Sequence, residues 1–180
     1  MTERADTGLA ALLRASIRDI PDFPKPGILF KDITPVLSNA TLFRAVISQL
    51  GEQFRSSGID LVVGIESRGF ILAAPMALEL GVGFVPIRKP GKLPFQKKRV
   101  DYALEYGQDA LEAHIDAIVA GHRVLIVDDV LATGGTAAAA AQLVRELGGA
   151  VAGLCFLIEL SFLNGRQKLA DLPVHAMVTY

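Results

Sequence analysis

The segment from Val124 to Ile158 contains two short apolar runs with one helix-length run between them. The first run, VLIV at 124–127, and the last, AVAGLCFLI at 150–158, have the length and composition of buried strands. The middle run, Thr136–Leu147, is rich in alanine and is followed by two glycines, which is typical of a helix and its end. Strands joined by such a crossover lie parallel in one sheet. The segment therefore predicts an α/β fold.

Short apolar runs and helix-length runs alternate through most of the chain. We expect strands at Ile59–Ile65 and Val82–Ile87, with a helix at Phe70–Leu80 between them. The other expected elements are helices at Leu9–Ile20 and Thr41–Ser56, the second capped by Ser38 or Asn39, and a half-exposed strand or hairpin arm within ALEAHIDAI at 110–118. This order predicts a mainly parallel sheet flanked by helices on both faces.

The size and charge of the chain limit what it can be. With 180 residues and no internal repeat, we expect one domain over residues 1–180, with about the first 35 residues as a small flap. A net charge of -1 argues against binding nucleic acid or acidic membranes through overall charge. The chain contains no stretch of about 18 apolar residues, so no membrane span is expected. The polar start MTERADTG and the single cysteine, Cys155, are consistent with a soluble cytoplasmic protein.

The segment VLIVDDVLATGGT at 124–136 ends in a loop that suits a phosphate group. Ligands of parallel sheets bind at the carboxyl ends of strands, and glycines let the backbone approach them closely. The helix that follows turns its free N–H groups and the positive end of its dipole toward the loop. The spacing fits neither a P-loop nor GxGxxG, which favours a mononucleotide or sugar phosphate. The expected phosphate-binding residues, hereafter the phosphate loop, are Ala132, Thr133, Gly134, Gly135 and Thr136.

Asp128 and Asp129 stand directly before this loop. Ionised carboxylates only accept hydrogen bonds and would repel a phosphate, so they suit hydroxyl donors. A ribose whose 5′-phosphate occupies the phosphate loop would present its 2′- and 3′-hydroxyls to them, directly or through Mg²⁺ and its waters. The alternative interpretation is an ordinary loop with a helix cap, or a magnesium site of a receiver-like domain.

The same segment closely resembles the signature of the type I phosphoribosyltransferases, which bind 5-phosphoribosyl 1-diphosphate. Further segments resemble the members of that family that use adenine: FPKPGILFKDITPVL at 23–37, GIESRGF at 64–70, GVGFVPIRKPGKLP at 81–94, LEYG at 104–107 and GRQKLA at 165–170. The resemblance covers nearly the whole chain. It implies the type I phosphoribosyltransferase fold, with a base-binding hood in about residues 1–35 and a flexible catalytic loop.

A second anion site is expected after the strand at 59–65. From the residues alone, ESRG is either a capping loop or a site where the planar Arg68 fork and the Gly69 backbone hold a diphosphate. The resemblance favours the diphosphate site. It also implies that the loop containing Arg88, Lys89 and Lys92 contacts the diphosphate, in part across a dimer interface. The expected diphosphate-binding residues are Glu66, Ser67, Arg68, Gly69, Arg88, Lys89 and Lys92. Lys97, Lys98 and Arg99 are interpreted as part of a solvated, mobile loop.

The resemblance also implies which residues lie near the reacting atoms. It places Tyr102, Glu105 and Tyr106, within DYALEYG, in a segment that closes over the active site, with Glu105 and Tyr106 near the reacting atoms. Arg68 is expected beside the leaving group. Proton transfer from the purine to Glu105 is a hypothesis, and its alternative is a surface glutamate in a hairpin.

The expected adenine-binding residues lie in the segment PGILFK. The resemblance implies a backbone contact from Leu29 to the base. Phe30 either stacks on the base or belongs to the core. Lys31 stands where the family usually carries arginine, and lysine keeps the charge but lacks the planar fork.

The resemblance implies a purine-salvage enzyme that joins adenine to 5-phosphoribosyl 1-diphosphate, giving AMP and diphosphate. Mg²⁺ is expected as cofactor, held mainly by the substrate with help from Asp128 and Asp129. A homodimer is implied by the resemblance alone. The alternatives are a sister enzyme for hypoxanthine, guanine or orotate, and a non-catalytic regulator that senses the phosphoribosyl compound.

Overall fold

The computed structural model describes residues 3–103 and 107–180, with side chains from residue 8 onward. The chain forms two compact units, Met1–Gln49 and Leu50–Tyr180. Each unit is described by itself below, and the single domain expected over residues 1–180 stays a prediction.

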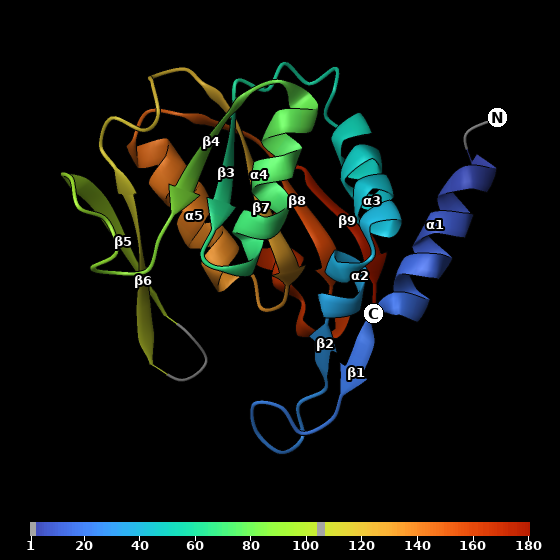
Figure 1. The fold of residues 1–180 in the computed structure, drawn as a ribbon. Helices are drawn as coiled ribbons and strands as arrows, with labels where there is room; N and C mark the ends of the chain where they lie inside the picture. Colours follow the sequence, from blue (N-terminus) through green and yellow to red (C-terminus); the bar gives the residue numbers. More distant parts are fainter. Residues whose placement is uncertain (1–2, 104–106) are drawn as a thin grey trace. The chain divides into compact units, whose positions relative to one another are not determined.

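The second unit is built on a five-stranded sheet in which every neighbouring pair of strands is parallel (Figure 1). The strands, in spatial order, are β4 (Gly83–Ile87), β3 (Leu61–Ile65), β7 (Arg123–Leu131), β8 (Ala150–Glu159) and β9 (Val174–Thr179). Every residue of β3 is buried, as expected for a strand covered on both faces. The predicted mainly parallel sheet is confirmed, and β9 is an additional strand that was not predicted.

Two crossover helices cover this sheet (Figure 1). The helix α4 (Arg68–Leu80) connects β3 to β4, and α5 (Gly135–Glu146) connects β7 to β8. The two crossovers run in opposite directions along the sheet. Because parallel crossovers are right-handed, the two helices lie on opposite faces. The predicted arrangement of helices flanking the sheet is therefore confirmed.

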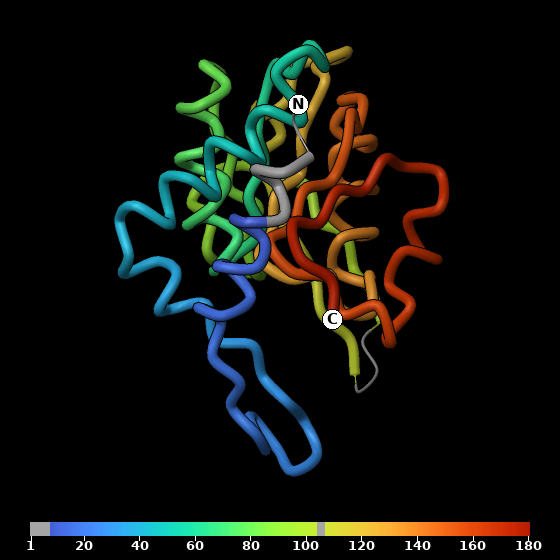
Figure 2. The backbone as a smooth tube through the Cα atoms, turned by 90° about the vertical axis from the view of Figure 1, so that its right-hand side faces the viewer, coloured from blue at the N-terminus to red at the C-terminus, as the bar shows by residue number. Residues whose placement is uncertain are grey.

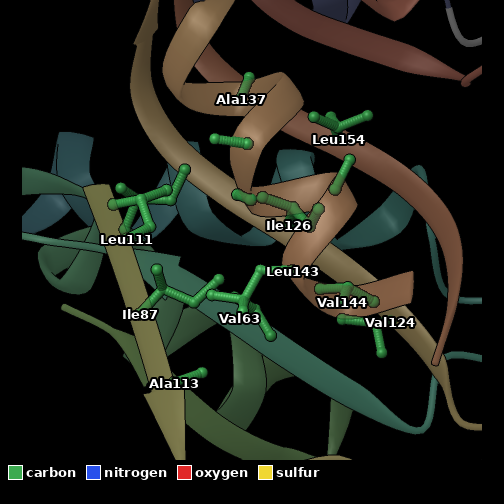
Figure 3. Packing of buried hydrophobic residues seen from close by; sticks show 14 of the residues in the cluster. Val63, Ile87, Leu111, Ala113, Val124, Ile126, Ala137, Leu143, Val144 and Leu154 are labelled. Atoms are coloured by element: carbon green, nitrogen blue, oxygen red, sulfur yellow. The ribbon is translucent and has the colours of Figure 1, made fainter. Parts of the chain in front are cut away.

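The hydrophobic core on the α5 side of the sheet joins three layers (Figure 3). Leu143 and Val144 of α5 pack toward Val63 and Ile126 of the sheet, and Leu111 belongs to the same cluster. All five side chains are fully buried. This packing fixes the position of β7 and α5, which carry the phosphate loop between them.

The third layer is an antiparallel hairpin of β5 (Lys97–Ala103) and β6 (Gln108–His114). The hairpin corrects two predictions. Lys97–Arg99 is exposed to solvent as predicted but belongs to a strand rather than a loop, because these residues pair with β6. The predicted hairpin arm is confirmed as β6, but its residues 110–113 are all buried rather than half-exposed, because α5 packs on the hairpin and Arg88 bridges to Glu112.

In its described residues the first unit contains two helices, two strands and most of a third helix. Its elements are α1 (Glu3–Ser16), β1 (Arg18–Ile20), β2 (Phe30–Asp32), α2 (Thr34–Ser38) and α3 (Ala40–Glu52), whose last residues belong to the second unit. The helix predicted to reach Ile20 ends at Ser16, because residues 18–20 pair with β2 (Figure 2). The predicted cap Asn39 is confirmed, since its Oδ1 accepts a hydrogen bond from Leu42 N at 3.1 Å. The helix it caps ends at Glu52, short of the predicted Ser56.

None of the helices in the described residues has both the length and the apolar character needed to cross a membrane.

Candidate functional site

The carboxyl ends of β3 and β7 are neighbours in the sheet, and the chain leaves them in opposite directions. In open α/β sheets such a reversal is where ligands bind. The predicted diphosphate loop at Glu66–Gly69 follows β3, and the phosphate loop follows β7. A methyl group built on Gly69 would lie 2.7 Å from Asp128 Oδ1 and 3.0 Å from the carbonyl oxygen of Val127. The structure therefore brings the two predicted anion sites together.

The phosphate loop has the geometry of an anion site at a helix start. α5 begins at Gly135, and Gly134 caps it in the left-handed conformation, with φ at 78°. The Gly134 carbonyl accepts the first helical hydrogen bond, from Ala138 N at 2.9 Å. The first turn of α5 carries no acidic side chain. Its free N–H groups and dipole therefore face the loop without a competing carboxylate.

Gly165 packs directly behind the phosphate loop. It begins the short 3-10 helix η2 (Gly165–Leu169), which follows η1 (Ser161–Leu163). A methyl group built on Gly165 would overlap the carbonyl oxygen of Ala132, and one built on Gly134 would overlap the carbonyl oxygen of Gly165. Such close backbone approach requires glycine on both sides. The GRQKLA segment thus supports the loop from behind, a role that the sequence analysis did not assign.

Arg166 anchors this supporting segment to the end of β8. Its Nε and Nη2 donate to the two carboxylate oxygens of Glu159 at 2.7 and 2.8 Å, and Nη1 donates to the Val174 carbonyl at 3.0 Å. Glu159 is buried, so the bidentate pair is a firm attachment. Nearby, Lys168 Nζ lies 3.8 Å from the point that a methyl group on Gly135 would occupy. The segment therefore also adds positive charge beside the start of α5.

Asp128 and Asp129 lie within β7 rather than after it. The strand continues to Leu131, which pairs with Glu159 of β8, so the predicted strand end at Val127 is wrong. Both carboxylates lie against the start of α4. Asp128 Oδ1 accepts a hydrogen bond from Asp129 N at 2.9 Å, and Asp129 Oδ2 lies 2.7 Å from Arg68 Nε.

The electrostatics of this aspartate pair are unusual. Burial, and then the charge of Asp129, raise the pKa of the Asp128 carboxyl well above its ordinary value. Burial also raises the pKa of Asp129, although the Arg68 guanidinium opposes that shift. Arg68 Nε is close to Asp129 Oδ2 but is not aligned with it, since this buried oxygen has no hydrogen bond among the described residues. The pair therefore retains capacity to accept hydrogen bonds or a cation.

Glu66 organises two of the predicted diphosphate-binding cations. Its Oε2 accepts hydrogen bonds from Arg88 Nε at 3.0 Å and from the Lys89 backbone N–H at 2.8 Å. The Arg88 guanidinium holds the pKa of Glu66 below its usual range. Glu66 is thus placed to orient the cations, while Ser67 and Lys92 are exposed.

The segment from Arg88 to Lys92, hereafter the cation loop, is also tied to β6. Arg88 and Glu112 exchange backbone hydrogen bonds at 2.9 and 2.8 Å. The buried Glu112 carboxylate accepts a further hydrogen bond from Gly91 N at 3.1 Å. Gly91 has φ at 77°, a conformation that favours glycine. The cation loop therefore has a fixed backbone held from both ends.

The predicted base-binding residues lie in the first unit. Leu29 is 49% exposed, and the Phe30 ring packs edge-on against Phe23 with centroids 5.1 Å apart. Lys31 is buried and its Nζ lies 2.6 Å from Asp19 Oδ1, its direct partner across the β1–β2 pair. The Lys31 ammonium is therefore engaged within its own unit, and the roles of these residues toward a base stay predictions. Glu105 and Tyr106 lie outside the described residues.

Comparison with known proteins agrees with this geometry. Residues 33–172 match the model of the phosphoribosyl transferase domain. Adenine phosphoribosyltransferase of Anaeromyxobacter dehalogenans is 60% identical over 168 residues, which are 93% of this chain and 98% of the relative. The chain belongs to the adenine phosphoribosyltransferase family.

Solved structures of this family have the same fold. The adenine phosphoribosyltransferase of Thermoanaerobacter pseudethanolicus superposes with a TM-score of 0.93 at 51% identity, over 95% of this chain and 99% of that one. The Saccharomyces cerevisiae enzyme, crystallised with adenine and an imino-altritol bisphosphate, gives a TM-score of 0.90 at 45% identity, also over 95% and 99%. The predicted type I phosphoribosyltransferase fold is confirmed.

The structure adds contacts to the site that sequence reasoning did not assign. Tyr102 and Asp109, from the two hairpin strands, both contact the side chain of Lys89. Gly165 and Arg166 fix the phosphate loop from behind. GRQKLA and Tyr102, the latter within DYALEYG, carried a sequence signal through the resemblance to the family. Asp109 carried none, because its contact with Lys89 joins segments that are distant along the chain.

Proposed function

We propose that this enzyme transfers the 5-phosphoribosyl group from 5-phosphoribosyl 1-diphosphate to adenine, giving AMP and diphosphate. The phosphate loop with the aspartate pair before it, at the reversal point of the sheet, is the observation that carries the proposal. The phosphate loop offers N–H donors to the 5′-phosphate of the substrate, and the aspartate pair offers carboxylate acceptors to its ribose hydroxyls. The identity to adenine phosphoribosyltransferases supports adenine as the acceptor.

The residues of this site would act mainly by position and charge. Breaking the bond between ribose C1 and diphosphate develops positive charge on the sugar and negative charge on the leaving group. Arg68, Arg88 and Lys89 would stabilise the leaving diphosphate, and the phosphate loop would hold the opposite end of the molecule. A substrate held at both ends has its reacting carbon fixed between them.

Magnesium fits this site as a partner of the substrate. No group of three or more metal-ligating side chains occurs in the part of the chain that the structure describes. Mg²⁺ commonly binds through one or two carboxylates together with substrate oxygens and water, and Asp128 and Asp129 supply such a pair. When bound, the ion would neutralise part of the diphosphate charge.

The test of the proposal is an assay of AMP formation. With Mg²⁺ and phosphoribosyl diphosphate, we expect adenine to yield AMP and diphosphate, and equimolar hypoxanthine to leave the rate unchanged. Faster diphosphate release with hypoxanthine, guanine or orotate would assign the protein to a sister enzyme. Binding of phosphoribosyl diphosphate without turnover of any base would indicate a sensing regulator instead.

Glu105→Gln provides a prediction for the closing segment. Removing the proposed proton acceptor should lower kcat about 100-fold and change KM for adenine little, because the amide keeps the shape but not the basicity. Steady-state kinetics with both substrates would measure the separate effects on kcat and on KM. Unchanged turnover would remove Glu105 from the mechanism.

The assembly and the compartment are also proposals. We propose a homodimer, following the family resemblance, and sedimentation equilibrium would measure the mass of the assembly.

We propose the cytoplasm as compartment, supported by the single cysteine, Cys155, which cannot form an intrachain disulfide and is fully buried.

A further inference from the structure

The hydroxyl of Tyr102 joins both predicted anion sites. It accepts hydrogen bonds from Lys89 Nζ of the cation loop at 2.9 Å and from Thr136 Oγ1 of the phosphate loop at 3.3 Å. It donates to Asp109 Oδ2 at 3.2 Å. A phenol has one proton to donate and two lone pairs to accept with, so all of its hydrogen-bonding capacity is used.

The hairpin presents this hydroxyl from a fixed position. Tyr102 and Asp109 are direct partners across the β5–β6 pair, so their side chains lie on the same face of the hairpin. The next cross-strand pair on that face is buried, since Val100 is 4% exposed and its partner Leu111 is 0% exposed. The ring edge of Tyr102 is also close to Gly135, because a methyl group built there would lie 3.7 Å from its Cδ2.

Among the hydrogen-bond partners of the Tyr102 hydroxyl, Lys89 is the one that belongs to the cation loop. Asp109 Oδ2 also accepts a short hydrogen bond from Lys89 Nζ, so two of the three ammonium protons are directed by the hairpin. Although burial disfavours the charge, the hydrogen bonds to Asp109 and Tyr102 raise the pKa of Lys89. Within the part of the chain that the structure describes, no hydrogen bond uses the third proton, which is left to point at an anion. The lysine side chain is flexible, so hydrogen bonds to Asp109 and Tyr102 fix the orientation of its ammonium group.

We propose that Tyr102 is a positioning residue for the phosphoribosyl substrate, which acts by directing Lys89 toward the diphosphate. The proposal rests on the proposed function for the identity of the substrate. It makes the hairpin part of the diphosphate site. It also explains why a tyrosine, with two acceptor sites, stands where the two loops meet.

The test removes only the hydroxyl, with Tyr102→Phe, and measures diphosphate binding by calorimetry. Loss of a hydrogen bond to a charged group should weaken the affinity for inorganic diphosphate about tenfold. In the AMP assay, kcat/KM for phosphoribosyl diphosphate should fall by a similar factor while KM for adenine stays unchanged. Asp101→Asn, on the exposed face of the same strand, is the matched control and should change neither value.

Lys89→Met distinguishes positioning from general support of the hairpin. If Tyr102 acts through Lys89, adding Tyr102→Phe to Lys89→Met should cause little further loss of diphosphate affinity. Full additivity of the two losses, or unchanged diphosphate binding in Tyr102→Phe, would overturn the proposal. Because diphosphate binding is measured without a base, failure of adenine turnover in the unmodified protein would count against the proposed function and not against this inference.

Discussion

Gly165→Ala is expected to reduce kcat/KM for phosphoribosyl diphosphate about 100-fold, although Gly165 carries no side chain to contact a ligand. The added methyl group would overlap the carbonyl oxygen of Ala132 and lie 3.0 Å from the backbone nitrogen of Gly134. Both atoms are backbone, so they cannot rotate away as a side chain would. The phosphate loop must therefore shift, so that its N–H groups no longer point toward the 5′-phosphate.

The measurement combines kinetics, binding and thermal unfolding. Binding of ribose 5-phosphate should weaken together with kcat/KM, and Tm should fall by several degrees because overpacking costs about 1–3 kcal/mol. Gly8→Ala is the control, since a methyl group there has nothing within 4 Å and lies in the α1 helix. It should leave activity unchanged. Normal ribose 5-phosphate affinity in Gly165→Ala would show that the loop is not held by this contact.

The parts of the fold that were predicted correctly are those specified by neighbouring residues. The strand–helix–strand runs around Val124–Val127 and Phe70–Leu80 were found because their periodicity is local. The strand over Lys97–Arg99 was missed because its charged sequence forms a strand only through pairing with β6 and contact with α5. The early end of α1 has the same origin, since pairing with Phe30–Asp32 takes residues 18–20 into a strand.

The candidate site divides in the same way. The phosphate loop and the aspartate pair were predicted because one continuous segment carries both the glycines and the carboxylates. The resemblance placed Tyr102 in the segment expected to close over the site, but the contacts of Gly165, Tyr102 and Asp109 could not be predicted from any local pattern. Each acquires its role by meeting a segment about 20 or more residues away, as Tyr102 does with Thr136.

Asp128→Asn is expected to make the protein more stable at pH 8 and less active. Burial and the charge of Asp129 raise the pKa of Asp128, so ionising this carboxyl costs folding free energy. The stability of the unmodified protein should therefore fall as pH rises from about 4 through the raised pKa of the folded state. The asparagine variant does not titrate there and keeps an oxygen to accept the hydrogen bond from Asp129 N.

The difference in Tm between the variant and the unmodified protein, without ligand, should thus be small near pH 4 and grow in favour of the variant toward pH 8. Asp171→Asn is the control with the opposite sign, because Arg145 holds the pKa of exposed Asp171 below its usual range. Its small loss of stability should appear at pH 8 and vanish as pH falls through that lowered pKa.

Activity should change in the other direction. An amide is a weaker acceptor than a carboxylate for ribose hydroxyls and a poorer ligand for Mg²⁺, so kcat/KM for phosphoribosyl diphosphate should fall about 10- to 100-fold. Binding of inorganic phosphate, which needs only the phosphate loop, should be retained. If the variant were less stable at pH 8, or lost both ligands equally, the carboxylate would be a structural residue. A gain in stability together with a selective loss of affinity for the ribose compound would instead show that the Asp128 charge is maintained for binding at the expense of folding free energy.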